Sequence, residues 1–417
     1  RDGSSRPPPG LRGVAILGAS VGYYGFYDYW NTAQCELLGT TCATLMVLTA
    51  LRTRGLTRAG LGVGLLAGVA FVLKPPFLLF GLVAVAVLAV RARRRGLLRP
   101  LVACMAGAVV LPAAGLAYFA LHGALHDLVE LVGSANAVYL ENEARLGSVA
   151  EVVDNAVVVW RGYSPLAGCL FVASGVAVSV ALVRRSRRRL ARWALAVAML
   201  AVGYAVIVVQ LKFYYYHWIV ELAGGTLLLA NVVVDASAAV RATRRAWVSV
   251  LVSVVLLEAF ARTGPQAGSW LRTTVATVQW LRGDWDRARF AATFQTWDGV
   301  RRYADVEATG LWLRDRSTPG DELLVRGVAA EIYVVSRLHA PGRFFWTSFL
   351  TRPSRRFHRE AWLAEDAAVI DEKKPRWVVT WTETRDGPES EGYFLPRGYV
   401  ERTRIGPYTV LERPRAR

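Results

Sequence analysis

The stretch Gln210-Leu-Lys-Phe-Tyr-Tyr-Tyr-His-Trp-Ile-Val-Glu221 joins two strongly apolar runs of the sequence. It places a lysine, three tyrosines, a histidine, a tryptophan and a glutamate within twelve residues. At the end of a membrane helix such side chains reach water, because aromatic rings favour the level of the lipid headgroups and a lysine extends its ammonium toward lipid phosphate. The stretch therefore indicates the mouth of a membrane helix, either as an aromatic belt alone or as part of a binding site.

Composition divides the chain into two parts. Of its 417 residues, 54% are hydrophobic and the mean hydropathy is +0.31, which is too apolar for an ordinary soluble protein. Residues 1–261 contain 24 Lys and Arg and 12 Asp and Glu, whereas residues 262–417 contain 26 and 20. We expect a helical membrane domain over residues 1–261, an interfacial connector over 262–300 and an extracytoplasmic α/β domain over 301–417.

Apolar segments in the first part predict about nine transmembrane helices. The segments are 13–29, 36–51, 59–74, 76–90, 98–121, 163–183, 193–211, 217–234 and 246–261. The net charge of +18 would suit nucleic acid, but the arginines form short clusters between these segments, as in cytoplasmic loops. We therefore expect the lipid bilayer as a partner and no nucleic acid.

The charge of the loops predicts how the chain is oriented. Arginine clusters occupy alternate loops, at residues 52–58, 91–99, 184–192 and 241–245, and the intervening loops carry the acids. Because positive loops stay in the cytoplasm, the N-terminus of this chain is expected inside and the C-terminal domain outside. The four cysteines, Cys35, Cys42, Cys104 and Cys169, form no metal-type pair, so no disulfide framework or zinc site is predicted.

The last part of the chain alternates helical and strand patterns. Helices are expected over 299–316, 329–337 and 359–373, strands over 322–326 and 377–381, a turn at 318–321, and a hairpin over 399–412 that turns at Gly406-Pro407. This pattern predicts a small Rossmann-like layer. The sequence lacks a Gly-x-Gly-x-x-Gly motif, so no nucleotide site is expected, and Glu331 and Tyr333 are interpreted as structural.

Polar residues at the outer ends of the spans are candidates for a site. The chain has four lysines against 46 arginines, and the membrane part contains only Lys74 and Lys212. A compact ammonium binds phosphate as a point charge, although both lysines also suit simple membrane anchoring. Because Lys74 precedes two prolines, a tight hairpin is expected there. Together with Asp28, Glu36, Lys212, His217 and Glu221, Lys74 is expected to line one outer pocket.

Several short motifs carry a family resemblance over most of the chain. They are Gln34-Cys35-Glu36, the run Gly64 to Lys74, the run Lys212 to His217, Trp312-Leu313-Arg314, and Thr318-Pro-Gly-Asp-Glu-Leu-Leu-Val325. Together they resemble the bacterial members of the C-fold (GT-C) integral-membrane glycosyltransferases, the relatives of protein O-mannosyltransferase and of the aminoarabinose transferase of lipid A.

The resemblance implies an enzyme of the bacterial inner (plasma) membrane. It would transfer a sugar from a polyprenyl-phosphate donor to a glycan, lipid or protein acceptor on the extracytoplasmic face. No cofactor and no metal ligands are implied, and a divalent metal requirement stays open. The donor phosphate is assigned to Lys74, Lys212, Tyr216 and His217, and the acceptor or sugar side to Gln34, Glu221, Tyr139, Glu141 and Arg161.

The base for the acceptor hydroxyl is the point where the chain departs from the family. In the family a carboxylate in the first outer loop has this role, and the chain starts beyond that loop. The base is therefore expected upstream of Arg1, with Asp28 and Glu36 as less favoured candidates, or else the chain is an inactive relative. Two other classes stay open: a transporter, which predicts charges in mid-span and internal repeats, and a scaffold whose outer domain binds a partner.

Overall fold

The computed structural model of the protein forms two compact units. One unit consists of residues 1–125 and 146–272, and the other of residues 126–145 and 273–417. The structure describes residues 34–92, 96–135, 187–210, 215–228, 265–295, 301–327, 329–344, 359–381 and 390–415, with single positions at 150, 151, 153, 154, 230, 231, 234, 347 and 350.

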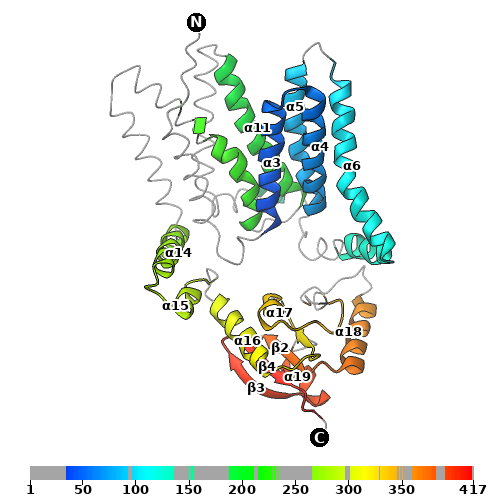
Figure 1. Cartoon of the computed structure of the whole chain (residues 1–417), viewed down its shortest axis with the longest axis vertical. Helices are drawn as coiled ribbons and strands as arrows, with labels where there is room; N and C mark the ends of the chain where they lie inside the picture. Colours follow the sequence, from blue (N-terminus) through cyan, green and yellow to red (C-terminus); the bar gives the residue numbers. More distant parts are fainter. Residues whose placement is uncertain are drawn as a thin grey trace. The chain divides into compact units, whose positions relative to one another are not determined.

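Five stretches among the described residues of the first unit are long and apolar enough to cross a membrane. They belong to α3 (Cys35–Arg52), α4 (Leu56–Leu73), η1 (Pro75–Leu78) with α5 (Leu79–Ala92), α6 (Leu98–Leu121) and α11 (Arg187–Val209), which lie side by side in Figure 1. Five of the predicted spans are thus confirmed as helices. The spans 13–29, 163–183 and 246–261 lie outside the described residues, so the number nine stays a prediction.

The predicted span 217–234 differs from the structure at its start. Residues Tyr215–Glu221 form the 3₁₀ helix η3, and regular α-helix begins only at Leu222. The cause is local, because aromatic and β-branched residues such as Trp218, Ile219 and Val220 are weak α-helix formers. The tighter 3₁₀ winding sets the direction in which the side chain of His217 points.

The hairpin expected at Lys74-Pro75-Pro76 is present. The ring of Pro75 disfavours helical geometry at Lys74, whose φ of −167° and ψ of 115° are extended. The helix α4 consequently ends at Leu73, although the Lys74 N–H still donates to the carbonyl of Ala70 at 2.9 Å. The chain then turns through η1 into α5.

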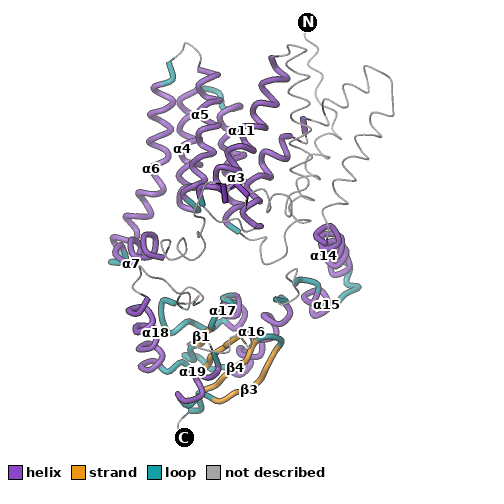
Figure 2. The backbone as a smooth tube through the Cα atoms, turned by 180° about the vertical axis from the view of Figure 1, so that it is seen from behind, coloured by secondary structure: helices purple, strands orange, loops and turns teal. Residues whose placement is uncertain are grey.

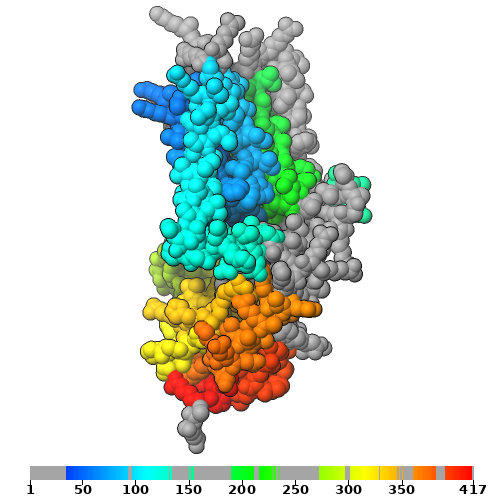
Figure 3. Space-filling model, turned by 90° about the vertical axis from the view of Figure 1, so that its right-hand side faces the viewer, coloured from blue at the N-terminus to red at the C-terminus, as the bar shows by residue number. Residues whose placement is uncertain are grey.

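Close contact between α4 and α6 depends on glycine. A Cβ atom at Gly60 would collide with the carbonyl of Pro100, and one at Gly64 with the carbonyl of Cys104. Small residues at such a contact let two membrane helices approach closely. The rest of α6 is largely open, with apolar side chains such as Val102 and Met105 exposed along the surface that Figure 3 shows in cyan, as expected for contact with lipid.

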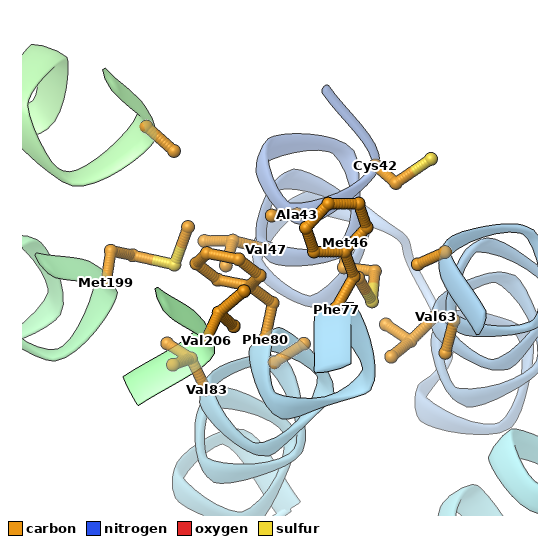
Figure 4. Packing of buried hydrophobic residues seen from close by; sticks show 14 of the residues in the cluster. Cys42, Ala43, Met46, Val47, Val63, Phe77, Phe80, Val83, Met199 and Val206 are labelled. Carbon is orange, nitrogen blue, oxygen red and sulfur yellow. The ribbon is translucent and has the colours of Figure 1, made fainter. Parts of the chain in front are cut away.

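The core of this unit is formed by α3, α4, η1, α5, α11 and η3. Figure 4 shows Met46 of α3, Phe77 of η1, Phe80 of α5 and Met199 of α11 pointing toward one another, and all four side chains are fully buried. The ring of Phe77 occupies the space that a Cβ atom at Gly39 of α3 would need. This packing fixes the hairpin that carries Lys74 against the start of α3.

Two helices precede the sheet of the second unit, where a mixed connector was expected. They are α14 (Pro265–Leu281), whose first residues belong to the first unit, and α15 (Arg287–Ala292). Asp286 caps α15 by accepting a hydrogen bond from the Arg289 N–H at 2.7 Å. The rings of Trp280 and Phe290 stack at 4.6 Å and join the two helices.

A four-stranded sheet organises the second unit (Figure 2). Its strands are β1 (Leu323–Val325), β2 (Trp377–Trp381), β3 (Val400–Ile405) and β4 (Tyr408–Glu412), in the order β1-β2-β4-β3. The first two strands are parallel, and β4 is antiparallel to both of its neighbours. On its other side β1 makes a single parallel bridge, between Glu322 and His339.

Helices cover both faces of this sheet. One face packs Val325 and Val379 against α16 (Tyr303–Arg316) and α17 (Glu331–Ser336). The other packs Leu324 and Val378 against α18 (Arg359–Lys373) and α19 (Glu391–Phe394), with the turn η4 (Leu395–Arg397) following. Residues 299 and 300 lie outside the described residues. The helix predicted over 299–316 begins only at Tyr303, and residues 301 and 302 are not helical. The other predicted helices, strands, turn and hairpin are confirmed within two residues.

Residues 126–135, in the long loop after α6, belong to the second unit. They form the end of α7 (Leu125–Val129) and a π-helical turn, η2 (Glu130–Ala135). The Trp362 Nε1–H donates to Glu130 at 2.6 Å, and Arg343 lies 3.4 Å from Asp127 and 3.6 Å from Glu130. These contacts attach the segment to α18 and its neighbourhood.

Candidate functional site

Three ionisable side chains from distant parts of the sequence meet at one end of the first unit. The ammonium of Lys74 lies 2.5 Å from a carboxylate oxygen of Glu36 and 3.3 Å from Nε2 of His217. That nitrogen is 3.6 Å from the same oxygen of Glu36. We call these three residues the mouth cluster, because they lie where α3 begins, where α4 ends and within η3.

The start of α3 positions the carboxylate. Glu36 lies in the first turn of the helix, where the free backbone N–H groups favour a negative charge. Its side chain is completely buried, and the Cys35 thiol donates to its second oxygen at 3.3 Å. A carboxylate buried to this extent needs a charged partner, and the structure provides Lys74.

The hairpin between α4 and α5 positions the ammonium. Lys74 follows the last residue of α4, where the helix carbonyls favour a positive charge. Its side chain is 26% exposed, unlike Glu36 and His217 at 0% and 1%. An ammonium has three N–H donors. Two of them point to Glu36 and His217, and the third has no partner among the residues that the structure describes.

The histidine is held by η3. An ammonium can only donate, so Nε2 of His217 accepts and its ring is neutral with the proton on Nδ1, a tautomer that we infer from the contact. The Thr40 hydroxyl of α3 lies 3.2 Å from the carbonyl of Ile219 and 2.7 Å from that of Glu36, which ties η3 to α3. The ring of Tyr216 meets the imidazole edge to face at 4.5 Å.

The mouth cluster as a whole is close to neutral. One carboxylate balances one ammonium, and a neutral imidazole adds a dipole. Such an arrangement fixes an ammonium in place while leaving part of it accessible. It can therefore donate a directed hydrogen bond to an anionic group without carrying the full field of an isolated cation.

Other predicted residues are only partly described. Gln34 precedes α3 in an extended conformation beside Glu36. Glu221, at the end of η3, is buried against α11 near Gly203, and one of its oxygens has no hydrogen-bond partner in the described part of the chain. The remaining candidates lie outside the described residues: Asp28, Tyr139, Glu141, Arg161 and Lys212.

Sequence reasoning did not find the pairing of Lys74 with Glu36. The lysine was expected as a phosphate ligand and the glutamate as a possible base, whereas they form one ion pair. It also missed the contributions of Cys35 and Thr40. In the second unit it missed a buried pair between Arg326 and Asp366, although an arginine directly after the apolar strand Leu323–Val325 was a usable signal.

One group of metal-type ligands occurs in the described residues. Potential ligand atoms of His126, Asp127 and Glu130 lie within 4.8 Å of one another on the surface. The guanidinium of Arg343 lies close to both carboxylates, at 3.4 Å and 3.6 Å, and so already supplies their positive charge. We assign no metal to this group.

Comparison of the chain with protein-family models, with curated proteins and with solved structures finds no match in any of the three. Function therefore has to be inferred from the chemistry of the mouth cluster and from the resemblance of the sequence motifs.

Proposed function

We propose that this chain is a membrane glycosyltransferase that transfers a sugar from a polyprenyl-phosphate donor to an acceptor on the extracytoplasmic face of a bacterial plasma membrane. In this proposal the membrane part has about nine spans, the arginine-rich loops are cytoplasmic and the outer domain is a Rossmann-like α/β layer. The donor and the acceptor hydroxyl would meet at the mouth cluster, at the opposite ends of α3 and α4 from Arg52, Arg54 and Arg58.

The observation that carries the proposal is the state of Lys74. Its ammonium is fixed by Glu36 and His217, it is still 26% exposed, and its third N–H has no partner among the residues that the structure describes. When the bond between the sugar carbon and the phosphate oxygen breaks, negative charge collects on the leaving phosphate. A preorganised donor at that oxygen stabilises the charge as it develops, which is the largest contribution in many enzymes.

The remaining residues have supporting roles in this scheme. Glu36 holds the ammonium in place, and because it is buried and ion-paired it is a poor acceptor for the proton of the incoming hydroxyl. That proton requires another carboxylate, for which Asp28 remains a candidate. The new bond forms between the acceptor oxygen and the sugar carbon, and the polyprenyl phosphate leaves as an anion.

Release of polyprenyl phosphate from polyprenyl-phosphate sugars tests the proposal without knowledge of the acceptor. The full chain is assayed in bacterial membranes with donors that carry mannose, glucose or arabinose. The informative variant is Glu36→Gln with Lys74→Met, which removes both charges together and so leaves no unpaired buried ion. Lys373→Met is the matched control, since that lysine is half exposed on the outer domain.

We expect the double variant to release product about 10- to 100-fold more slowly, which corresponds to loss of one hydrogen bond to a charged group. The control should keep the wild-type rate. Equal rates in the double variant and the wild type, or no release by the wild type with any donor, would contradict the proposal and favour a scaffold or a transporter.

A further inference from the structure

Three helices of the second unit end at the edge of the sheet where its parallel strands begin. The helices α16 and α18 end at Arg316 and Lys373, shortly before β1 and β2. After β1 the chain passes through α17 and returns beside β1, where His339 bridges to Glu322. The carbonyl ends of helices favour cations, and basic residues occupy the last turns of α16 and α18 and the position that follows α17. This edge of the sheet is therefore rich in positive charge.

The surface is hollowed at this edge. The hollow has a volume of about 490 Å³, which is within the range of small-molecule sites, and it is lined by residues 314, 317–322 and 336–339. The helices α16 and α17 meet closely at Gly310, where a Cβ atom would collide with the side chain of Val335. This contact brings Arg314, one turn after Gly310, and Arg337 to the same hollow. We call its three basic residues, Arg314, Arg337 and His339, the amino edge.

The two carboxylates in the wall of the hollow already have cationic partners outside it. Asp321 accepts hydrogen bonds from Arg376 at 2.8 Å and from Arg415 at 3.2 Å. Glu322 lies 3.9 Å from the ammonium of Lys373. Because these pairs balance the negative charge of the wall, the amino edge makes the hollow attractive to anions.

The arginines of the amino edge are not neutralised in the same way. Arg337 is exposed and makes no ion pair with any residue that the structure describes. Arg314 is 43% exposed and approaches only its sequence neighbour Asp315, at 4.0 Å, an exposed contact that contributes little. The imidazole of His339 is exposed as well and can donate a hydrogen bond. The amino edge therefore offers two guanidinium groups with unused donors to an anion in the hollow.

The backbone of Arg337 is in a conformation that favours glycine. Its φ of 60° and ψ of 25° are left-handed, and the residue that follows a helix in this conformation is usually a glycine. The Arg337 N–H donates to the Tyr333 carbonyl at 2.9 Å, so the end of α17 fixes this conformation. A side chain at such a position is strained. The arginine thus supplies a cation to the hollow where glycine would give the more stable turn.

The chemistry of the amino edge matches a phosphate group. A guanidinium binds phosphate through two parallel hydrogen bonds and stays charged at any ordinary pH. Two guanidinium groups suit a phosphate ester, which carries one or two negative charges. From this arrangement we propose that the amino edge binds a phosphate ester, whose glycerol or sugar part occupies the rest of the hollow. The site goes beyond the proposed transfer reaction and does not depend on it.

Two small phosphate esters test the site and distinguish the sources of the ligand. The full chain in phosphatidylcholine nanodiscs is titrated with glycerol phosphate, a soluble monoester, and with glycerophosphoglycerol, the headgroup of phosphatidylglycerol without its acyl chains. Binding is followed by saturation-transfer NMR, and succinate is added as a competing dicarboxylate. Tighter binding of glycerophosphoglycerol assigns the site to a lipid headgroup, and tighter binding of glycerol phosphate assigns it to a soluble ester.

We expect the wild type to bind at least one ester saturably, with a Kd of about 1 mM, and succinate not to displace it. Arg314→Gln and Arg337→Gly should each weaken binding about tenfold or more, the effect of one hydrogen bond to a charged group. Arg337→Gly should also leave the melting temperature unchanged or raise it, because glycine relieves the strained backbone. A residue that served only the fold would not combine these two effects.

Arg316→Gln is the matched control for loss of one positive charge. Arg316 lies in the same last turn of α16 as Arg314, but it donates to the Trp312 carbonyl at 3.3 Å and does not line the hollow. Its substitution should leave binding unchanged. The double variant Glu36→Gln with Lys74→Met should also bind the ester as the wild type does, whatever its transfer activity.

Four results would overturn the proposal. Neither ester binds, succinate displaces the bound ester as effectively as an equal concentration of that ester, Arg314→Gln and Arg337→Gly bind like the wild type, or Arg316→Gln weakens binding as much as they do. Loss of binding in Glu36→Gln with Lys74→Met would also overturn it, because the ester would then occupy the mouth cluster.

Discussion

In each unit the described residues include an ion pair with a fully buried carboxylate or guanidinium, and the two pairs differ in what they leave accessible. Arg326 and Asp366 are 1% and 5% exposed and meet through two parallel hydrogen bonds. Lys74 meets the buried Glu36 through one contact and is 26% exposed. The planar guanidinium of an arginine binds one carboxylate through two parallel hydrogen bonds. An ammonium is a point charge with donors in several directions. The first pair is suited to hold a fold together, and the second is suited to present a charge.

The largest effect is expected from breaking the Arg326–Asp366 pair in the second unit. Arg326→Met leaves the carboxylate of Asp366 buried without a partner, which should lower the free energy of unfolding by about 3–5 kcal/mol. Chemical denaturation followed by fluorescence measures this loss. Arg326→Met combined with Asp366→Leu should recover most of it. If the single substitution costs less than about 1 kcal/mol, the pair does not hold the domain together.

A smaller loss is expected from Lys74→Met alone. Because water reaches the partly exposed lysine site, the unpaired Glu36 should cost about 2 kcal/mol, less than a fully enclosed charge. Thermal unfolding in nanodiscs is the measurement. Adding Glu36→Gln should restore the melting temperature, whereas release of polyprenyl phosphate should stay slow. The double variant therefore distinguishes the role of Lys74 in activity from its role in stability. If Glu36→Gln restored both the melting temperature and the release rate, the Lys74–Glu36 pair would serve only to stabilise the fold, as the Arg326–Asp366 pair does.

The pH dependence of the second unit's stability provides a third comparison. Burial alone would raise the pKa of Glu412 and Asp321, but hydrogen bonds and charges from Arg376, Arg402, Arg415 and Thr318 outweigh it and lower both pKa values from 4.5 and 3.8. A carboxyl with a lowered folded-state pKa stabilises the fold above its ordinary pKa, and this stability is lost as the pH falls through the folded-state value.

We therefore expect the second unit to lose stability as the pH falls below about 4.5, and Arg376→Met to reduce that loss by raising both folded-state pKa values. Denaturation midpoints across this range give the slope. A slope that Arg376→Met leaves unchanged would mean that other carboxyls dominate the acid response.

The smallest effect is expected at Thr40. Thr40→Val removes the hydroxyl that ties η3 to α3 through the Ile219 carbonyl, at a cost of about 1 kcal/mol. Because η3 carries His217, the substitution should also slow the release of polyprenyl phosphate several-fold, although Glu36 and Lys74 stay paired. If Thr40→Val releases polyprenyl phosphate at the wild-type rate, the Glu36 carboxylate alone is enough to hold Lys74 in place.

The sequence allowed most of the local structure to be predicted. Proline after Lys74 indicated the hairpin, apolar runs indicated five helices that the structure contains, and turn residues such as Gly406 indicated the last hairpin. These features depend on neighbouring residues, so a linear pattern contains the required information. The 3₁₀ helix over Tyr215–Glu221 was not predicted, because hydropathy indicates a membrane segment and does not distinguish α from 3₁₀ winding.

Partnerships across the fold could be predicted only in outline. The sequence suggested that Glu36, Lys74 and His217 share one end of the membrane helices, but the ion pair depends on how α3 and α4 are packed. Likewise, the pattern of α18 contains several acids, and only the fold shows that Asp366 is the one that faces Arg326.

The central claim is that the accessible ammonium of Lys74 binds a lipid-linked phosphate, and comparison of two lipids tests it most directly. Undecaprenyl phosphate and undecaprenol differ only in the phosphate, so the ratio of their affinities for the full chain in nanodiscs isolates its contribution. We predict that the wild type prefers the phosphate and that Glu36→Gln with Lys74→Met reduces this preference about 10- to 100-fold. A preference of equal size in the double variant would contradict the account.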